Sequence, residues 1–233
     1  MNYTGTQTAA DWQDRVRDIP ADSPEIKRTA DGAVELAFDG NRIDVITDPA
    51  ATNPGSANVL LDGKRPSEYP ECYAMTPSTT MWGHYWPALR SMSWNAPLLV
   101  EDWIARVLAV DPKTGRVDFE VIGSKTGHDG KGNTNEKFVS KSGRIVTDRK
   151  SWIFHRKGFD RKGPLPVGFE VKWSAIALST DLYKPAPVTD RTRESVFTLA
   201  QGVPNTRHVL RLEPTGDAPL KLAGFRVYRP PLK

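Results

Sequence analysis

Three kinds of feature are scarce in this sequence, and each scarcity excludes a class of protein. Of its 233 residues only Cys72 is a cysteine, so an internal disulfide framework and a cysteine-based zinc site are excluded. No apolar run approaches the roughly 18 residues of a membrane-spanning helix, and the N-terminus has no apolar signal core. A helix is predicted only at 9–18, a short and polar stretch. We therefore expect neither a membrane segment nor a helical protein.

Sequence motifs of catalytic sites are also missing. There is no Gly-x-Ser-x-Gly elbow, no Walker-type loop, no Gly-x-Gly-x-x-Gly and no His-Glu-x-x-His. The four histidines have no spacing that would set two imidazoles on one face. His208 alternates with Leu210 and Leu212, which favours a hydrogen-bonded core histidine, and Cys72 is interpreted as a buried small residue. We expect no enzymatic activity and no cofactor.

Alternation of apolar and polar residues dominates the chain, between 19 prolines and 18 glycines that are scattered rather than clustered. Residues 97–110 and 116–124 flank the turn sequence DPKTG and form the clearest predicted hairpin. A strand at 58–64 runs into an Asp62-Gly63 turn. Further strands are expected at 34–38, 42–46, 169–179, 194–202, 207–214 and 220–231.

Glycine, proline and asparagine indicate three breaks between these strands. DGN predicts a turn after 34–38, GVPNT predicts a turn-rich link after 194–202, and GHDGKGN predicts a loop at 127–133. Roughly ten short strands with frequent turns are typical of an all-β protein, an antiparallel β-sandwich or jelly roll. We expect a single β-sandwich domain at 31–233, preceded by a helical or irregular extension at 1–30.

The net charge of +4 conceals an uneven distribution. Residues 1–50 carry ten acids and five bases, whereas residues 125–172 carry twelve bases and five acids. The basic segment would suit an anionic partner such as a phosphate, an acidic glycan or an acidic protein surface. It is equally a pattern of a solvated loop face. Because no base-stacking pattern accompanies the charge, we do not expect nucleic-acid binding.

An aromatic cluster is the most unusual local feature. The stretch MWGHYWP at 81–87, followed by Trp94, holds three of the seven tryptophans. Rings on a shallow surface hold polar ligands such as sugars, with a few polar groups fixing orientation. The same rings would also cap a core or bury against another subunit. The candidate glycan platform comprises Trp82, His84, Tyr85, Trp86, Arg90 and Trp94.

The glycine-rich stretch at 128–136 carries oxygen ligands that a hard cation prefers. These are Asp129, Asn133, Asn135 and Glu136. Their spacing does not match the EF-hand loop, and a plain turn explains the composition as well. A structural calcium ion is the only metal that the sequence suggests.

Two segments carry a resemblance to a known family. The first, at 38–68, includes FDGNRIDVITDP and GSANVLLDGKRPSE, and the second, at 197–231, runs from FTLAQGVPNTRHVLRLEP to GFRVYRPP. Together they resemble the galactose-binding-like jelly-roll domain that stands beside the esterase domain in some bacterial SGNH (GDSL-type) hydrolases. The resemblance implies a β-sandwich that binds carbohydrate on its loops or concave face, as an appendage. The Gly-Asp-Ser and Asp-x-x-His motifs of the hydrolase itself are missing.

Two functions follow as hypotheses. The first is a non-catalytic, carbohydrate-binding β-sandwich module that acts beside an enzyme or within a larger assembly. The second is a virion structural protein, a phage capsid decoration or tail component that uses a jelly roll for subunit contacts. Both predict a carbohydrate or protein partner, and the second predicts a homo-oligomer. A virion or an extracellular surface would suit them as locations.

Overall fold

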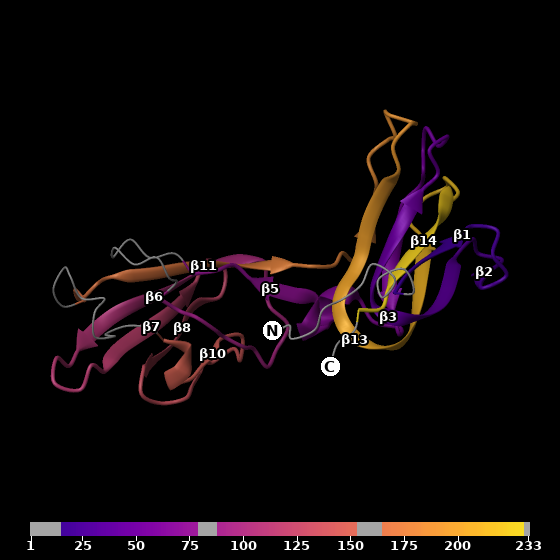
Figure 1. Cartoon of the computed structure of the whole chain (residues 1–233). Coiled ribbons are helices and arrows are strands. Elements are labelled where there is room, and N and C mark those ends of the chain that lie inside the picture. The colour runs from indigo at the N-terminus through magenta and orange to yellow at the C-terminus, as the bar shows by residue number, and fades with distance from the viewer. Residues whose placement is uncertain (1–14, 79–87, 153–164, 231–233) are drawn as a thin grey trace. The chain divides into compact units, whose positions relative to one another are not determined.

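The computed structural model describes residues 15–78, 88–152 and 165–230, and within these ranges the chain is all-β (Figure 1). It divides into two compact units. Unit 1 comprises Met1–Cys72 and Leu178–Lys233, and unit 2 comprises Tyr73–Ala177. Unit 2 is therefore an insertion into unit 1. The sequence predicts one domain because no Gly/Ser-rich linker marks either boundary of the insertion.

Unit 1 is built on one antiparallel sheet. Its strands are β1 (Val16–Pro20), β2 (Ile26–Arg28), β3 (Val34–Thr47), β4 (Ala57–Leu61), β12 (Leu182–Tyr183), β13 (Ser195–Pro214) and β14 (Leu222–Tyr228). The order is β1-β14-β3-β13-β4-β12, with β2 beside β3. Two short 3₁₀ helices, η1 (Pro66–Glu68) and η2 (Pro70–Cys72), follow β4. Although the sequence suggested an extension at 1–30, residues 16–20 and 26–28 pair with β14 and β3.

Two long strands, β3 and β13, form the centre of unit 1 (Figure 1). The predicted turns at DGN and GVPNT are wrong, since each lies inside one of these continuous strands. Both strands are irregular there, because the register between them shifts from Gln201 to Thr206. Gly202 supports the irregularity: its φ is +101°, and a Cβ there would lie 2.4 Å from the Glu71 carbonyl oxygen. Pairing on both sides of the irregularity keeps each strand continuous through residues that usually form turns.

The predicted faces of β3 are confirmed on both sides of this irregularity. Val34, Leu36 and Phe38 are buried, and so are Ile43 and Val45. The buried apolar positions are even-numbered before the irregularity and odd-numbered after it, so their alternation changes phase within the strand. Because of this change of phase, the sequence predicts two strands, 34–38 and 42–46, where the structure has one.

One edge of β3 is incompletely paired. β2 pairs with it up to Leu36, and β14 pairs with it from Arg42 onward. Residues 37–41 therefore have no strand partner on this edge. Gly40 lies in the gap, and a Cβ there would be 2.4 Å from the Tyr228 carbonyl oxygen at the end of β14. Glycine lets the end of β14 approach closely.

Unit 2 contains a five-stranded antiparallel sheet in the order β5-β11-β6-β7-β8. Its strands are β5 (Tyr73–Met75), β6 (Glu101–Val110), β7 (Val117–Gly123), β8 (Gly127–Asn133) and β11 (Glu170–Ala177). A two-stranded ribbon of β9 (Phe138–Val139) and β10 (Val146–Thr147) precedes the 3₁₀ helix η3 (Arg149–Ser151). The β6–β7 pair confirms the predicted hairpin.

The inner face of this sheet is the core of unit 2. Every second residue is buried, from Trp103 on β6 through Phe119 on β7 to Trp173 on β11. The ring of Phe119 contacts Phe138 at 5.3 Å and Trp152 at 4.7 Å between centroids. Apolar burial of this kind is the main source of stability.

The predicted loop at 127–133 is wrong, because these residues form β8. Their glycines are needed where Phe138 covers the strand: a Cβ on Gly132 would lie 2.5 Å from the Phe138 ring. The glycines thus make room for a ring, and the ring supplies the packing that glycine lacks.

The all-β, antiparallel character predicted from the sequence is confirmed and is consistent with a β-sandwich. The finer assignment of a jelly roll stays a prediction. The predicted helix at 9–18 is wrong where the structure describes it, because Val16–Pro20 is a strand. Residues 9–14 lie outside the described ranges. Within the described residues, no helix is long and apolar enough to cross a membrane.

Candidate functional site

The predicted aromatic platform is only partly described. Trp82, His84, Tyr85 and Trp86 lie outside the described residues. Arg90 is exposed, and its backbone N–H donates to the carbonyl of Ser151 over 2.7 Å. Trp94 is half-buried. The structure therefore places two of the six side chains in unit 2, and the glycan platform stays a prediction.

The predicted calcium ligands are occupied by contacts within the protein. Asp129 is buried on β8 and accepts from the backbone N–H and hydroxyl of Ser142, at 2.9 and 2.6 Å. Asn133 donates from Nδ2 to Glu136 over 3.0 Å and accepts from the N–H of Asn135 over 3.0 Å. Among the described residues no group of three or more His, Cys, Asp or Glu side chains could hold a metal ion. These hydrogen bonds give Asp129, Asn133, Asn135 and Glu136 a structural role, since they hold the neighbouring turns in place.

His208 is confirmed as a hydrogen-bonded core residue. It is 5% exposed, and its Nδ1 lies 2.7 Å from Oδ2 of Asp62. Its Nε2 lies 2.8 Å from the carbonyl oxygen of Pro204. Both ring nitrogens are therefore engaged by oxygen atoms of the protein, which explains the histidine as a structural residue.

Cys72 is confirmed as a buried residue. Its side chain is inaccessible to solvent, and burial raises the pKa of the thiol to about 11. A thiol in this state is a poor nucleophile because little thiolate forms at neutral pH.

The outer face of the unit 2 sheet carries a groove. It lies across β11, β6 and β7, and its volume is about 470 Å³. Its lining residues are Thr76, Asp102, Trp103, Ile104, Ile122, Ser124, Glu170, Lys172, Trp173 and Ser174. The alternation that buries Trp103 and Trp173 on the inner face turns their neighbours outward.

Cross-strand register arranges the outward side chains in rows. The middle row is apolar, because Ile104 of β6 stands opposite Ile122 of β7. Lys172 of β11 stands on the other side of Ile104. Both isoleucines are only partly buried. The groove floor is thus a strip of aliphatic side chains with a cation at one end.

The row on one side of this strip carries hydroxyl and carboxylate groups. The Ser174 hydroxyl donates to Oδ1 of Asp102 over 2.6 Å, and the backbone N–H of Asp102 donates to the Ser124 hydroxyl over 3.1 Å. Thr76 accepts from the backbone N–H of Ser174 over 2.9 Å. These groups are held in place by their neighbours while their other hydrogen-bonding positions face the groove side of the sheet.

The row on the other side is a charged chain. Arg106 donates to Glu170 over 3.1 Å and to Glu120 over 3.1 Å. Glu170 also contacts Lys172 over 3.1 Å, and Glu120 lies 3.4 Å from His128. The hydrogen bond from Lys172, followed by that from Arg106, lowers the pKa of the Glu170 carboxyl. The row is therefore a pre-ordered border of alternating charge.

Part of this groove was visible in the sequence. Alternation at 169–179 separates Glu170, Lys172 and Ser174 from the apolar positions. The sequence did not reveal which strands lie beside β11. The pairing of β6 with β7 is a local hairpin, whereas the pairing of β6 with β11 joins segments that are far apart in the sequence. Ile104 and Lys172 are neighbours only because β6 pairs with β11.

Comparisons with protein-family models, with curated proteins and with solved structures found no match to this chain. The resemblance to galactose-binding-like domains stays a prediction. Both segments that carry it, 38–68 and 197–231, lie in unit 1. The groove lies in unit 2, where the sequence resembles that family only loosely.

Proposed function

We propose that the protein is a non-catalytic binding module that holds a carbohydrate in the groove of unit 2. The observation that carries the proposal is the row pattern of the outer sheet face: an aliphatic strip of Ile104 and Ile122 between a hydroxyl-carboxylate row and a charged row. A sugar ring has C–H groups on its faces and hydroxyls around its rim. Such a ring would rest on the strip and exchange hydrogen bonds with both borders.

The geometry of the borders suits hydroxyl recognition. Asp102 and Glu170 accept hydrogen bonds, Lys172 donates them, and Ser174 and Thr76 can do both. The internal contacts of these side chains reduce the conformational entropy that binding would otherwise cost. The groove is also shallow and open, as suits one portion of a longer chain.

The contacts of Cys72 and His208, two side chains of unit 1 that could in principle take part in catalysis, support a non-catalytic assignment. Cys72 is buried with a raised pKa, and both nitrogens of His208 are engaged. Each has a structural role that its contacts explain.

Titration calorimetry of the full chain against neutral di- and trisaccharides, chosen from a broad glycan array, tests the proposal. We expect millimolar to micromolar binding. The double variant in which serine replaces both Ile104 and Ile122 is expected to bind about tenfold or more weakly. Each substitution removes aliphatic contact with the sugar that is worth roughly 1 kcal/mol. Val196→Ser is the control, because Val196 is an aliphatic strand residue of unit 1 that lies on the surface outside the groove.

The variants Trp82→Ala and Trp86→Ala test the aromatic loop separately. Loss of binding in these alone would assign the ligand to the loop rather than to the sheet face. An absence of binding to every glycan would overturn the proposal. In that case stable self-association in analytical ultracentrifugation would favour the alternative function, a structural component of a virion or another assembly.

A further inference from the structure

Unit 1 contains a second groove, and its lining is strongly basic. Its volume is about 490 Å³. The lining residues are Arg15, Arg17, Pro24, Glu25, Lys27, Ala37, Phe38, Asp39, Arg207, Val227 and Arg229. Five of them are basic and two are acidic, which is a net charge of +3. This concentration is unexpected, since residues 1–50 are acidic as a whole.

The fold creates this groove at the unpaired edge of β3. Residues 37–39 line its floor, in the gap between the last residue paired to β2 and the first paired to β14. Strand pairing then gathers the cations around the gap. Arg17 on β1 stands opposite Val227 on β14, and Arg207 on β13 stands opposite Asp39 on β3. Basic residues that are far apart in the sequence meet at one opening.

Most of these cations lack a side-chain partner within 15–78, 88–152 and 165–230. Arg17 pairs with Glu25 over 2.6 Å. Among the residues that the structure describes, the side chains of Arg15, Lys27, Arg207 and Arg229 take part in no hydrogen bond or ion pair. Arg207 has none even with its register neighbour Asp39. Within the described ranges, the groove therefore holds positive charge that no side-chain ion pair neutralises.

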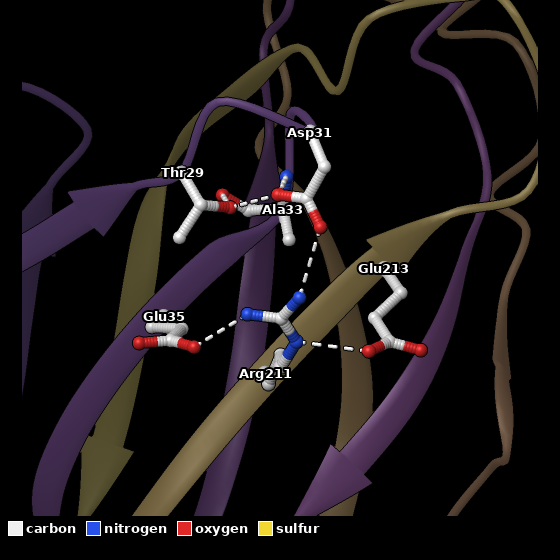
Figure 2. A network of polar contacts seen from close by, with 6 residues as sticks. All are labelled: Thr29, Asp31, Ala33, Glu35, Arg211 and Glu213. Carbon is white, nitrogen blue, oxygen red and sulfur yellow. Dashed lines mark hydrogen bonds and ion pairs between the residues drawn. The ribbon is translucent and has the colours of Figure 1, made fainter.

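Three other arginines of the same sheet are paired with carboxylates. Arg211 contacts Asp31, Glu35 and Glu213 at 3.0, 2.5 and 2.9 Å (Figure 2). The hydrogen bonds that Arg211 donates to Glu213 and then to Glu35 raise its pKa. Arg226 is held by Asp18 and Glu194, and Arg42 by Asp44. Among the described residues, the groove cations Arg15, Lys27, Arg207 and Arg229 lack the carboxylate partners that these three arginines have.

We propose that this groove binds a compact polyanion, a small molecule carrying at least two phosphate or sulfate groups. Arginine is suited to such groups because its planar fork donates two parallel hydrogen bonds to an oxyanion. Several cations around one concave opening fit charge concentrated in a small ligand. A nucleic-acid strand would instead require cations along an extended path with exposed rings for its bases, and the ring in this lining, Phe38, is buried.

The site is independent of the carbohydrate proposal, because it lies in the other unit and selects for charge. Calorimetric titration of the full chain at about 50 mM sodium chloride would use tripolyphosphate, a trisulfated disaccharide and inorganic phosphate. We expect binding of one or both polyanions, at least about tenfold tighter than that of inorganic phosphate. Raising the salt to about 300 mM should weaken it, since ions screen exposed charges. Which polyanion binds better distinguishes a phosphorylated from a sulfated ligand.

Charge-reversal variants locate the site. Arg207→Glu and Lys27→Glu are each expected to weaken binding by about tenfold or more. Arg191→Glu makes the same change in net charge at an exposed loop position of unit 1, outside the groove lining, and should alter affinity less than about twofold. Arg207→Lys should retain part of the affinity, because it keeps the charge and loses the fork. All three positions are exposed, and circular dichroism checks that each of the four variants folds.

The proposal is overturned if neither polyanion binds, or if Arg191→Glu weakens binding as much as the groove variants. Binding of a fluorescently labelled single-stranded oligonucleotide is measured as a further test of the ligand class. Binding of the oligonucleotide about tenfold tighter than of both polyanions, with the same dependence on Arg207, would overturn the assignment to a compact ligand and identify nucleic acid instead.

Discussion

The imidazole of His208 shows how much one buried side chain organises in unit 1. It links the turn after β4, through Asp62, to the irregular part of β13, through Pro204. Asp62 itself has a φ of 51°, and its Oδ1 accepts from the backbone N–H of Val209 over 2.7 Å. A charge-assisted hydrogen bond that is mostly buried is costly to break, because the remaining partner stays desolvated.

We therefore expect His208→Gln to lower the free energy of unfolding by about 2 kcal/mol, since one acceptor of the pair loses its donor. Asp62→Asn should cost about 1 kcal/mol, because asparagine tolerates positive φ and keeps the acceptor for Val209. Urea denaturation measures both. Asp217→Asn, at an exposed position, should stay within about 0.5 kcal/mol. Equal stability of His208→Gln and this control would contradict the structural role of His208.

Among the elements, the outer strand β1 depends on an ionic contact with β14. Asp18 and Arg226 are direct cross-strand partners, and Arg226 donates to both oxygens of Asp18 at 2.7 Å. The hydrogen bond from Arg226 lowers the pKa of the Asp18 carboxyl below its ordinary value of 3.8. A lowered pKa in the folded state means that this contact stabilises the protein above about pH 4 and is lost as the pH falls through the folded value.

Acid denaturation should therefore depend on Asp18. In Asp18→Asn the stability near pH 6 should be lower than in the wild type, and the difference should shrink between about pH 4 and pH 2 as the wild-type carboxylate is protonated. Chemical denaturation at a series of pH values measures this difference. Because Asp18 is partly exposed, the effect is reduced by solvent screening and salt. A difference that persists unchanged at pH 2 would show that the ion pair is not its cause.

At the level of the whole chain, the two points where the chain passes between unit 1 and unit 2 are close together. The backbone N–H of Leu178 donates to the carbonyl of Cys72 over 2.8 Å, so the two ends of unit 1 that flank the insertion are adjacent. Each unit has its own sheet and its own buried apolar residues. Domains with these properties usually tolerate the removal of an insertion.

We expect residues 1–72 joined to 178–233 by a short glycine-serine linker to fold, and residues 73–177 to fold as a separate fragment. Dispersed amide signals in heteronuclear NMR spectra and cooperative thermal unfolding would report each. Residues 1–72 alone should stay unfolded, because β3 would lack its partners β13 and β14. Unfolded spectra from both of the first two polypeptides would contradict the division into two units.

Much of the strand content was predictable because alternation and tight turns are local signals. Asp62-Gly63 forms the expected turn with positive φ at both residues, and Val117, Phe119 and Val121 of β7 share the expected face. Local signals failed where partners are distant. Glycine-rich 127–133 forms a strand that Phe138 covers, and DGN and GVPNT lie within strands because β3 and β13 pair on both sides of them.

The sequence by itself determined an all-β, antiparallel protein and the inward face of most strands, since these follow from the two-residue period of a strand. Only the tertiary structure decided which strands are neighbours, and with them both grooves. Ile104 meets Lys172 through a pairing of distant strands, and Arg207 meets Arg17 and Lys27 around a gap in the pairing of β3. Pairing between remote segments depends on burial summed over a whole sheet, which no short stretch of sequence contains.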